Sequence, residues 1–214
     1  MTNESRQIAK ILLSIGAVSL NAKKPFRYSS GILSPVYTDC RLIMSYPKER
    51  KLLIKLFSDT VSSHGSFDVI AGTATAGIPH AAWIAEKLSL PMIYARNKPK
   101  DHGKGNLIEG VLKKRQKVAV IEDLISTAQS SVVTVNAARN AGAIANYIFS
   151  ITTYNLSKSK EILKENKVKL ISLTNLSDLS SVALENKHIT AKENDMILQW
   201  ASDPSSWGNR MGFE

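Results

Sequence analysis

The sequence predicts an α/β fold in which helices flank a parallel sheet. Short apolar runs, typical of buried strands, alternate along the 214 residues with segments whose apolar side chains recur at helical spacing. Such alternation is typical of a parallel sheet whose strands are connected by helices. The hydrophobic content of 43% suffices for a core, and no repeat, linker or low-complexity segment divides the chain. We therefore expect one domain over residues 1–214.

The chain begins with an expected helix and a loop. Over residues 5–15, Ile8, Ile11 and Ile15 lie on one helical face. Gly16 is suited to end this helix, because glycine readily adopts left-handed backbone angles. A segment rich in turn residues follows.

The rest of the chain predicts a core and a carboxyl-terminal part. A helix near residues 45–63 has Pro47 in its first turn, where proline is favoured. The expected strands lie near residues 67–71, 91–96, 117–122, 145–153 and 168–173. The expected helices lie near residues 77–88, 130–141, 157–166, 178–186 and 191–201. These elements divide the domain into an amino-terminal helix and loop at 1–45, a core at 46–155 and a carboxyl-terminal strand and helices at 156–214.

The most informative stretch joins a strand, two acids and a hydroxyl-rich turn. The β-branched run at 118–121 leads to Glu122 and Asp123, at the sheet edge where open α/β sheets bind ligands. Four residues with hydroxyl groups follow, beside the free N–H groups at the start of the next helix: Ser126, Thr127, Ser130 and Ser131. Hydroxyls and free N–H groups at a helix start together favour binding of a phosphate. Because the acids suit sugar hydroxyls, the stretch predicts a site for a phosphorylated sugar. The alternative is an ordinary buried strand followed by a capped helix.

Two further segments suit anions. The polar loop after the strand at 91–96 has no apolar periodicity, as in many lids, and its charges match a diphosphate: Arg96, Lys98, Lys100, His102 and Lys104. In the small-residue turn at 72–79, Thr73 and Thr75 add hydroxyls to a second anion cradle. The alternatives are a solvated basic loop and tight strand–helix packing, respectively.

The motif Glu-Asp-Leu-Ile-Ser-Thr-x-x-Ser at 122–130 resembles the ribose-phosphate fingerprint of type I phosphoribosyltransferases, in the form found in orotate phosphoribosyltransferases. The resemblance implies that family's fold, with a small amino-terminal hood and carboxyl-terminal helices beside the parallel sheet. It implies that the acids hold the ribose of phosphoribosyl diphosphate (PRPP) and that the turn holds its 5-phosphate. The implied PRPP contacts here are Glu122, Asp123, Leu124, Ile125, Ser126, Thr127, Ala128, Gln129 and Ser130.

One departure from the family pattern falls in this turn. The family usually has Gly-Gly where Ala128 and Gln129 stand. A left-handed Ala or Gln costs about 1–2 kcal/mol. Taken wholly from ligand binding, this cost would weaken binding about tenfold or somewhat more.

The lid and the amino-terminal loop extend the resemblance. Arg96, Lys100 and His102 match an Arg-x-x-x-Lys-x-His loop that closes over diphosphate in the neighbouring subunit's site, which implies a homodimer. The second lysine that some members carry directly after the arginine is absent, and Lys98 replaces it only if the loop bends suitably. The segment 25–39, here called the substrate loop, contains Ser-Gly-x-x-Ser-Pro like the family's substrate loop, although these are also common turn dipeptides.

The resemblance implies transfer of phosphoribosyl from PRPP to orotate, giving orotidine 5-monophosphate and diphosphate in pyrimidine biosynthesis. It implies Lys100, His102 and Asp123 as catalytic residues, with Ser126 and Tyr37 at orotate. Mg²⁺ would be held mainly by PRPP. Two alternatives are a phosphoribosyltransferase acting on a purine and a PRPP-binding regulator without activity.

Composition limits the partners and the location that we expect for this protein. The net charge of +10 comes from basic residues spread along the chain, without a nucleic-acid-binding motif, so we expect no nucleic-acid partner. No apolar run approaches the ~20 residues that span a bilayer, and no signal-peptide pattern is present, so we expect a cytoplasmic protein without membrane contact. Cys40 is the only cysteine and is interpreted as packing.

Overall fold

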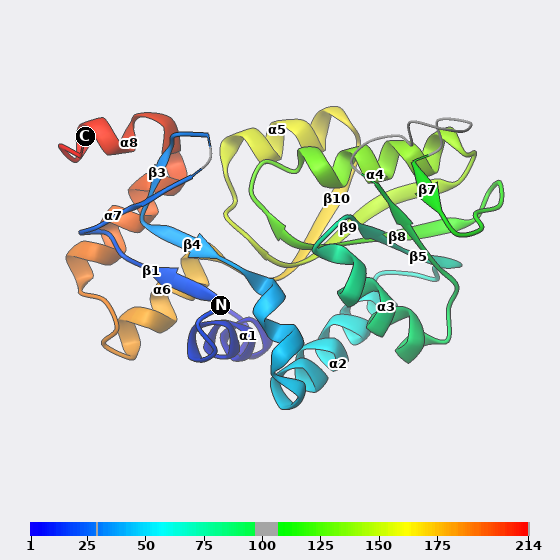
Figure 1. Ribbon diagram of the computed structural model, residues 1–214, viewed down its shortest axis with the longest axis horizontal. Coiled ribbons are helices and arrows are strands. Elements are labelled where there is room, and N and C mark those ends of the chain that lie inside the picture. Colours follow the sequence, from blue (N-terminus) through cyan, green and yellow to red (C-terminus); the bar gives the residue numbers. More distant parts are fainter. Residues whose placement is uncertain (29, 97–106, 214) are drawn as a thin grey trace.

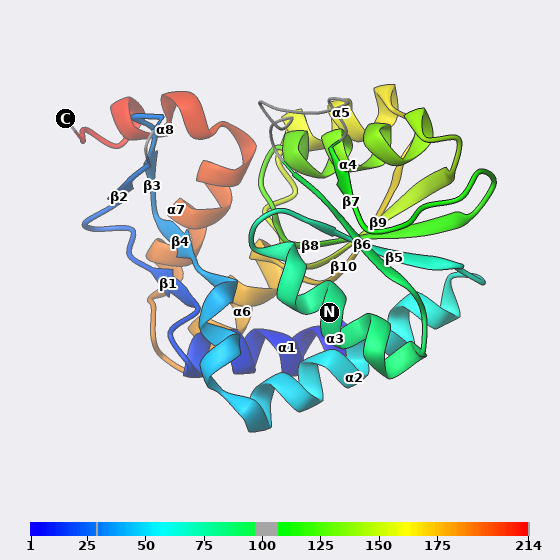
Figure 2. The ribbon, with the colours of Figure 1, turned by 45° about the vertical axis from the view of Figure 1, so that its right-hand side comes forward.

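The structure is a computed structural model and describes residues 1–28, 30–96 and 107–213. It has a larger core built on one sheet and a smaller part, the hood, made of residues 18–38 and 176–210 (Figures 1 and 2). Segments from both ends of the chain therefore form the hood.

The core sheet follows the strand order β10-β9-β8-β5-β6-β7 within the described residues. These strands are β5 (Val69–Thr73), β6 (Met92–Ala95), β7 (Ile108–Glu109), β8 (Lys117–Ile125), β9 (Ile144–Thr153) and β10 (Lys169–Asn175). All neighbours pair in parallel except β6 and β7, which are antiparallel. The predicted α/β fold with a mostly parallel sheet is confirmed.

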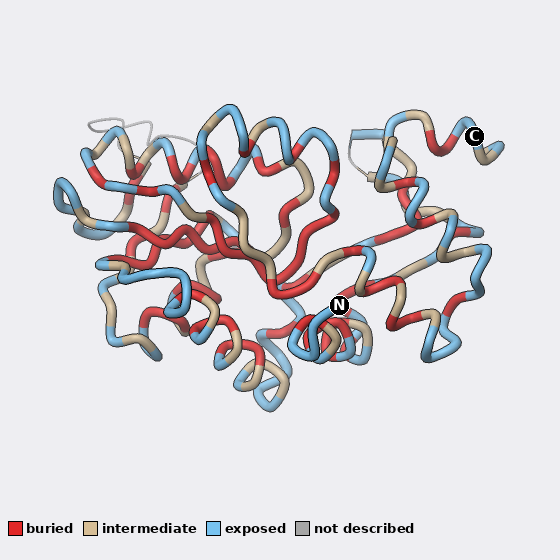
Figure 3. The backbone as a smooth tube through the Cα atoms, turned by 180° about the vertical axis from the view of Figure 1, so that it is seen from behind, coloured by how far each residue is buried: buried red, intermediate tan, exposed pale blue. Residues whose placement is uncertain are grey.

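Helices cover both faces of this sheet, as its continuous apolar strands require. Along β8, Ala119 and Ile121 point into one apolar cluster, while Val118 and Val120 point into the other. The first face packs against α1 (Asn3–Ser14), α2 (Pro47–Ser63) and α3 (Gly77–Leu88), and the second against α4 (Gln129–Asn140) and α5 (Ser157–Glu165). Figure 1 shows these two layers below and above the sheet, and Figure 3 shows the buried strands between them.

The hood consists of two short strand pairs and the last helices. β1 (Val18–Leu20) pairs with β4 (Val36–Thr38), and β2 (Phe26–Arg27) pairs with β3 (Leu33–Ser34). A 3-10 helix, η1 (Cys40–Ser45), leads from β4 into α2. The carboxyl-terminal helices are α6 (Leu176–Glu185), α7 (Ala191–Ser202) and α8 (Pro204–Arg210). Two buried tryptophans, Trp200 and Trp207, form the centre of their packing.

The structure corrects one strand boundary that matters for function. β8 was expected to end at residue 122, but it continues to Ile125. Its pairing with β9 extends through Leu124↔Thr152 and Ile125↔Thr153, beyond the point where β5 ends. Glu122 and Asp123 therefore lie inside the strand rather than after it.

The turn after β5 contains a glycine that no other residue can replace without a shift of the backbone. A Cβ atom on Gly77 would lie 2.5 Å from the carbonyl oxygen of Ile121. This contact brings the start of α3 directly against β8. Tight packing, the alternative interpretation of the small-residue turn, therefore accounts for Gly77.

Among the described residues, no helix is both long and apolar enough to cross a membrane.

Candidate active site

The carboxyl ends of β5 and β8 meet at the point where the sheet reverses its strand order. β5 and β8 are neighbours, and the chain continues from β5 to β6 on one side and from β8 to β9 on the other. Open α/β sheets bind ligands at such a switch point. Thr73 ends β5, Arg96 directly follows β6, and Asp123 lies near the end of β8. The fold thus brings three of the predicted site segments to one edge.

Glu122 joins the end of β8 to the start of α4. Its Oε2 accepts hydrogen bonds from the hydroxyls of Ser130 at 3.1 Å and Ser131 at 2.9 Å. Burial, followed by the charge of Asp123, raises the pKa of Glu122 to about 8. We therefore expect Glu122 to be mostly protonated at neutral pH, with the two serines fixing its carboxyl group against the helix.

Asp123 is half-buried and lies beside the segment that follows the substrate loop. Burial raises the pKa of Asp123, against the lowering effects of a hydrogen bond with Glu122, of backbone N–H groups and, least, of the charge of Arg41. Arg41 in turn binds Asp39 through Nε to Oδ1 at 2.6 Å and Nη2 to Oδ2 at 2.9 Å. Cys40 is fully buried, as the packing interpretation predicted, and burial together with Asp123 raises its thiol pKa well above the ordinary value. η1 therefore lies close to the two acids.

The turn between β8 and α4 contains one left-handed residue. Ala128 has φ 67° and ψ 4° and is buried. Gln129 is already the first residue of α4 and is exposed. Ser126 and Thr127 are half-buried between the strand and the helix. Of the two positions at which the family usually has glycine, only Ala128 adopts the backbone angles that glycine favours.

The turn after β5 places its two threonines differently. Thr73 is buried, and its hydroxyl has no hydrogen-bond partner in the part of the chain that the structure describes. Thr75 is exposed and follows a cis peptide bond after Ala74. The buried hydroxyl of Thr73 is thus available to a ligand or a water molecule.

Arg96 stands at the base of the predicted lid. Its N–H donates to the carbonyl of Leu107 at 2.9 Å, so the two ends of the lid lie side by side. Its Nη1 lies 3.7 Å from Oε1 of Glu109 on β7. The other predicted lid residues lie outside the described residues: Lys98, Lys100, His102 and Lys104.

The remaining predicted contacts lie around this edge. Leu124 is half-buried and Ile125 is buried, both within β8. Tyr37 lies on β4 with 46% of its surface exposed, and its ring centroid is 5.6 Å from that of Phe26. The sequence interpretation assigned the hydroxyls of Ser130 and Ser131 to phosphate and missed that both donate to Glu122 instead. It also missed the approach of η1 to Asp123, which depends on the tertiary fold and has no local signal.

Comparison with known proteins identifies the family. No family model matches the chain. The chain is 48% identical over 204 residues to orotate phosphoribosyltransferase from Listeria monocytogenes, covering 95% of this chain and 98% of the relative. It is 45% identical over 206 residues to the Coxiella burnetii enzyme of the same name, covering 96% and 99%.

The chain belongs to the orotate phosphoribosyltransferase family. A solved orotate phosphoribosyltransferase from Aeropyrum pernix has the same fold, with a TM-score of 0.73 and 26% identity over 86% of this chain and 99% of that chain. The resemblance found in the sequence motifs is thus confirmed at the level of both sequence and fold.

Proposed function

We propose that this protein transfers the 5-phosphoribosyl group of PRPP to orotate, giving orotidine 5-monophosphate and diphosphate in pyrimidine biosynthesis. Family membership over nearly the whole chain supports this activity. The observation that carries the proposal is the position of Asp123 at the switch point, beside a turn that opens α4. A carboxylate and a helix amino terminus together suit a sugar phosphate.

The ribose hydroxyls are assigned to the two acids. Asp123 is less buried than Glu122, and hydrogen bonds from Glu122 and from backbone N–H groups oppose the burial that raises its pKa, so we assign it as the main hydrogen-bond acceptor. Both serine hydroxyls donate to Oε2 of Glu122, and the N–H of Asp123 donates to Oε1 at 3.3 Å, so we assign the remaining acceptor capacity of Oε1 to the ribose. The 5-phosphate is assigned to the turn from Leu124 to Ser130, where the N–H groups at the start of α4 supply donors.

Orotate is assigned to Ser126 and Tyr37. Ser126 follows directly after β8, and Tyr37 lies on β4, the strand that leads to η1 beside Asp123. These positions support a site between the hood and the core. Specificity for orotate over a purine rests on the similarity of the substrate loop to that of the family.

The departing diphosphate is assigned to the turn after β5 and to the lid. Loss of diphosphate leaves a cation-like sugar centre that the base nitrogen attacks, so stabilisation of the leaving anion lowers the barrier. The anion would be bound by Thr73, Thr75 and Arg96 at the sheet edge. Lys98 would contribute if the lid bends toward the anion. Lys100 would neutralise the diphosphate, and His102 would donate a proton to it. A closed lid also excludes water, which competes for the sugar centre.

Mg²⁺ fits this arrangement as an ion held mainly by PRPP. Among the described residues, no group of three or more His, Cys, Asp and Glu side chains could hold a metal ion. Asp123 is the carboxylate suited to contact it, because Glu122 is hydrogen-bonded by two serines and its pKa is about 8. When bound, Mg²⁺ would offset the charge of the diphosphate.

A homodimer is supported by an exposed apolar patch next to the site. Leu42, Met44 and Tyr46 expose 39%, 41% and 40% of their surfaces on η1 and just after it. A second copy that covers this patch would lie beside Asp123, which η1 also approaches, and could extend its lid over the site. A cytoplasmic location remains our expectation.

The proposal is tested by supplying PRPP and Mg²⁺ with orotate, adenine, hypoxanthine or uracil and separating the products by chromatography. We expect orotidine 5-monophosphate with orotate and no nucleotide with the other bases. A nucleotide formed from a purine alone would favour the purine enzyme. PRPP binding without turnover of any base would favour the regulator.

A further inference from the structure

A buried tryptophan on α7 holds the middle of the substrate loop. Nε1 of Trp200 donates a hydrogen bond to the carbonyl oxygen of Leu33 at 2.9 Å, and Trp200 is 1% exposed. The Leu33 side chain packs against α8, where a Cβ atom on Gly208 would lie only 3.1 Å from Leu33 Cδ1. The carboxyl-terminal helices therefore contact both the backbone and the side chain of Leu33.

The same tryptophan is joined to the phosphate-binding turn through Tyr154. The N–H of Tyr154 donates to the carbonyl of Ile125 at 3.0 Å, directly before Ser126. The ring of Tyr154 meets that of Trp200 edge-on, with centroids 5.4 Å apart. A continuous path of buried contacts thus runs from the end of β8, through two aromatic rings, to Leu33.

Tyr28 adds a second link at the start of the loop. Its hydroxyl donates to the carbonyl of Val36 at 2.7 Å and lies 3.4 Å from the hydroxyl of Tyr154. Its ring is edge-on to Trp200, with centroids 6.3 Å apart. Tyr28, which belongs to the substrate loop, therefore connects the start of the loop to Val36 near its end and to Tyr154 and Trp200 outside it.

We propose that Trp200 is a positioning residue for orotate, which sets the distance between the substrate loop and the Ser126 turn without touching substrate. This inference rests on the proposed function, because it assigns orotate to those two segments. Its physical basis is that a buried carbonyl left without its donor is unfavourable and moves to find another partner. Loss of the indole N–H would therefore shift Leu33 and the residues next to it.

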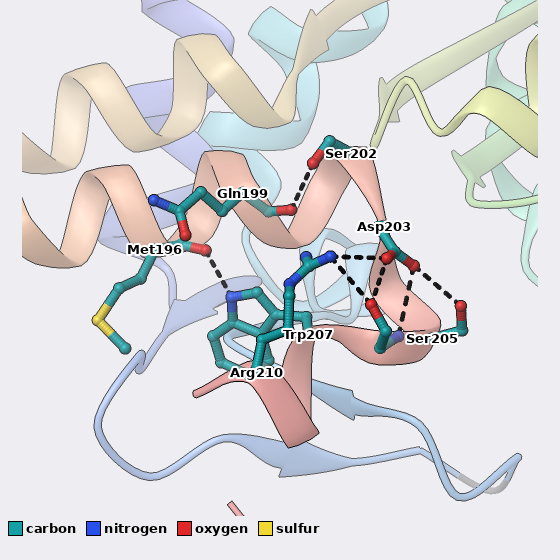
Figure 4. Close-up of polar contacts among 8 residues, drawn as sticks. Met196, Gln199, Ser202, Asp203, Ser205, Trp207 and Arg210 are labelled. Carbon is teal, nitrogen blue, oxygen red and sulfur yellow. Dashed lines mark hydrogen bonds and ion pairs between the residues drawn. The ribbon is translucent and has the colours of Figure 1, made fainter. Parts of the chain in front are cut away.

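A second tryptophan provides a matched control. Nε1 of Trp207 also donates to a carbonyl oxygen at 2.9 Å, that of Met196, and Trp207 is fully buried. This bond connects α8 to α7 and does not involve the substrate loop (Figure 4). The start of α8 is held separately by Asp203, whose carboxylate accepts hydrogen bonds from Ser205 Oγ at 2.9 Å and Arg210 Nη1 at 2.7 Å.

The test compares Trp200→Phe with Trp207→Phe, since each keeps an aromatic ring and loses one N–H···O=C bond. We expect similar losses of thermal stability in the two variants. We expect the KM for orotate to rise about three- to tenfold in Trp200→Phe, with the KM for PRPP unchanged. In Trp207→Phe, both KM values should stay within about twofold of the unsubstituted protein.

An orotate KM that changes equally in both variants, or in neither, would overturn the inference. If Trp200→Phe does not fold, Trp200→Tyr replaces it, because it also keeps an aromatic ring and removes the indole N–H, and an unchanged orotate KM there also overturns the inference. Failure of the proposed function is separate, because it would appear as no orotate turnover by the unsubstituted protein.

Discussion

At the scale of single residues, two adjacent acids differ because their surroundings differ. Burial and the charge of Asp123 favour the protonated carboxyl group of Glu122 at neutral pH and outweigh the hydrogen bonds from Ser130 and Ser131, which lower its pKa. Asp123 is half-buried, and hydrogen bonds from Glu122 and from backbone N–H groups, followed by the charge of Arg41, oppose the rise in its pKa. In the proposed site, Glu122 would shape the turn as a carboxyl group, and Asp123 would accept hydrogen bonds from the sugar as a carboxylate.

The raised pKa of Glu122 predicts a loss of stability as the pH rises. The folded protein holds the proton up to about pH 8, whereas the unfolded chain releases it near pH ~4.3. Between these values the folded state binds more protons, so the free energy of unfolding falls with rising pH, by at most about 1.4 kcal/mol per pH unit. Glu122→Gln cannot ionise and should lose this part of the pH dependence.

Urea unfolding at pH 5.5 and pH 8.5 measures the effect. We expect the free energy of unfolding to fall less between pH 5.5 and pH 8.5 in Glu122→Gln than in the unsubstituted protein. Glu165→Gln, an exposed change on α5, is the control and should leave the pH dependence unchanged. Equal pH dependence in the unsubstituted protein and Glu122→Gln would show that Glu122 is ionised in the folded state.

The residue types at the site could be predicted, but their partners could not. Glu122, Asp123 and the turn after them stand together in the sequence, and parallel strands bring Thr73 and Arg96 to the same edge. The influence of the Arg41 charge on Asp123 connects segments about 80 residues apart and depends on the docking of the hood. Such contacts have no periodic pattern in the sequence.

At the scale of elements, long periodic segments were predictable and short ones were not. The helix predicted at 77–88 is observed as α3 over the same residues. The two- and three-residue strands of the hood, η1, β7 and α8 were not predicted, because each is too short to show a period. α8 forms at Pro204 with Asp203 as its cap, and packing of Trp207 rather than helix propensity holds it in place.

The turn between β8 and α4 gives a prediction at this scale. Ala128→Gly relieves about 1 kcal/mol of left-handed strain and loses about 0.8 kcal/mol from a buried methyl group, so its stability should change little. Its KM for PRPP should fall several-fold, because glycine lets the backbone adapt to the phosphate. Gln129→Gly is the control, since Gln129 already lies in α4. It should lose up to about 1 kcal/mol of stability without tighter PRPP binding.

Steady-state kinetics with varied PRPP, together with urea unfolding, distinguish the two positions. A higher KM for PRPP in Ala128→Gly than in the unsubstituted protein would contradict the assignment of this turn to the 5-phosphate. The comparison also shows whether the departure from the family's Gly-Gly affects function.

At the scale of the whole molecule, the hood, the sheet edge and the exposed patch on η1 adjoin one another. Segments near both ends of the chain, residues 18–38 and 176–210, form the hood, so residues far apart in sequence surround the site (Figure 2). The patch of Leu42, Met44 and Tyr46 extends this region to the surface. An exposed apolar patch beside the site suits an enzyme in which the lid of one subunit closes over the site of its neighbour.

Mixing subunits tests whether the lid is shared. Lys100→Ala and Asp123→Ala should each be inactive alone, because each lacks one half of the site. When the two are dissociated and reassociated together, we expect orotate turnover to return, because one site of each mixed dimer has both groups intact. Absence of activity in dimers shown by mass spectrometry to be mixed would place lid and sheet edge in the same subunit.

The central claim is that the sheet edge at Asp123 binds PRPP for transfer to orotate. The most direct measurement is the loss of orotate absorbance with PRPP and Mg²⁺, for the unsubstituted protein, Asp123→Asn and the exposed control Asp59→Asn. We predict PRPP-dependent loss that is about a hundredfold slower in Asp123→Asn and unchanged in Asp59→Asn. No orotate loss with the unsubstituted protein, or full activity in a folded Asp123→Asn variant, would contradict this claim.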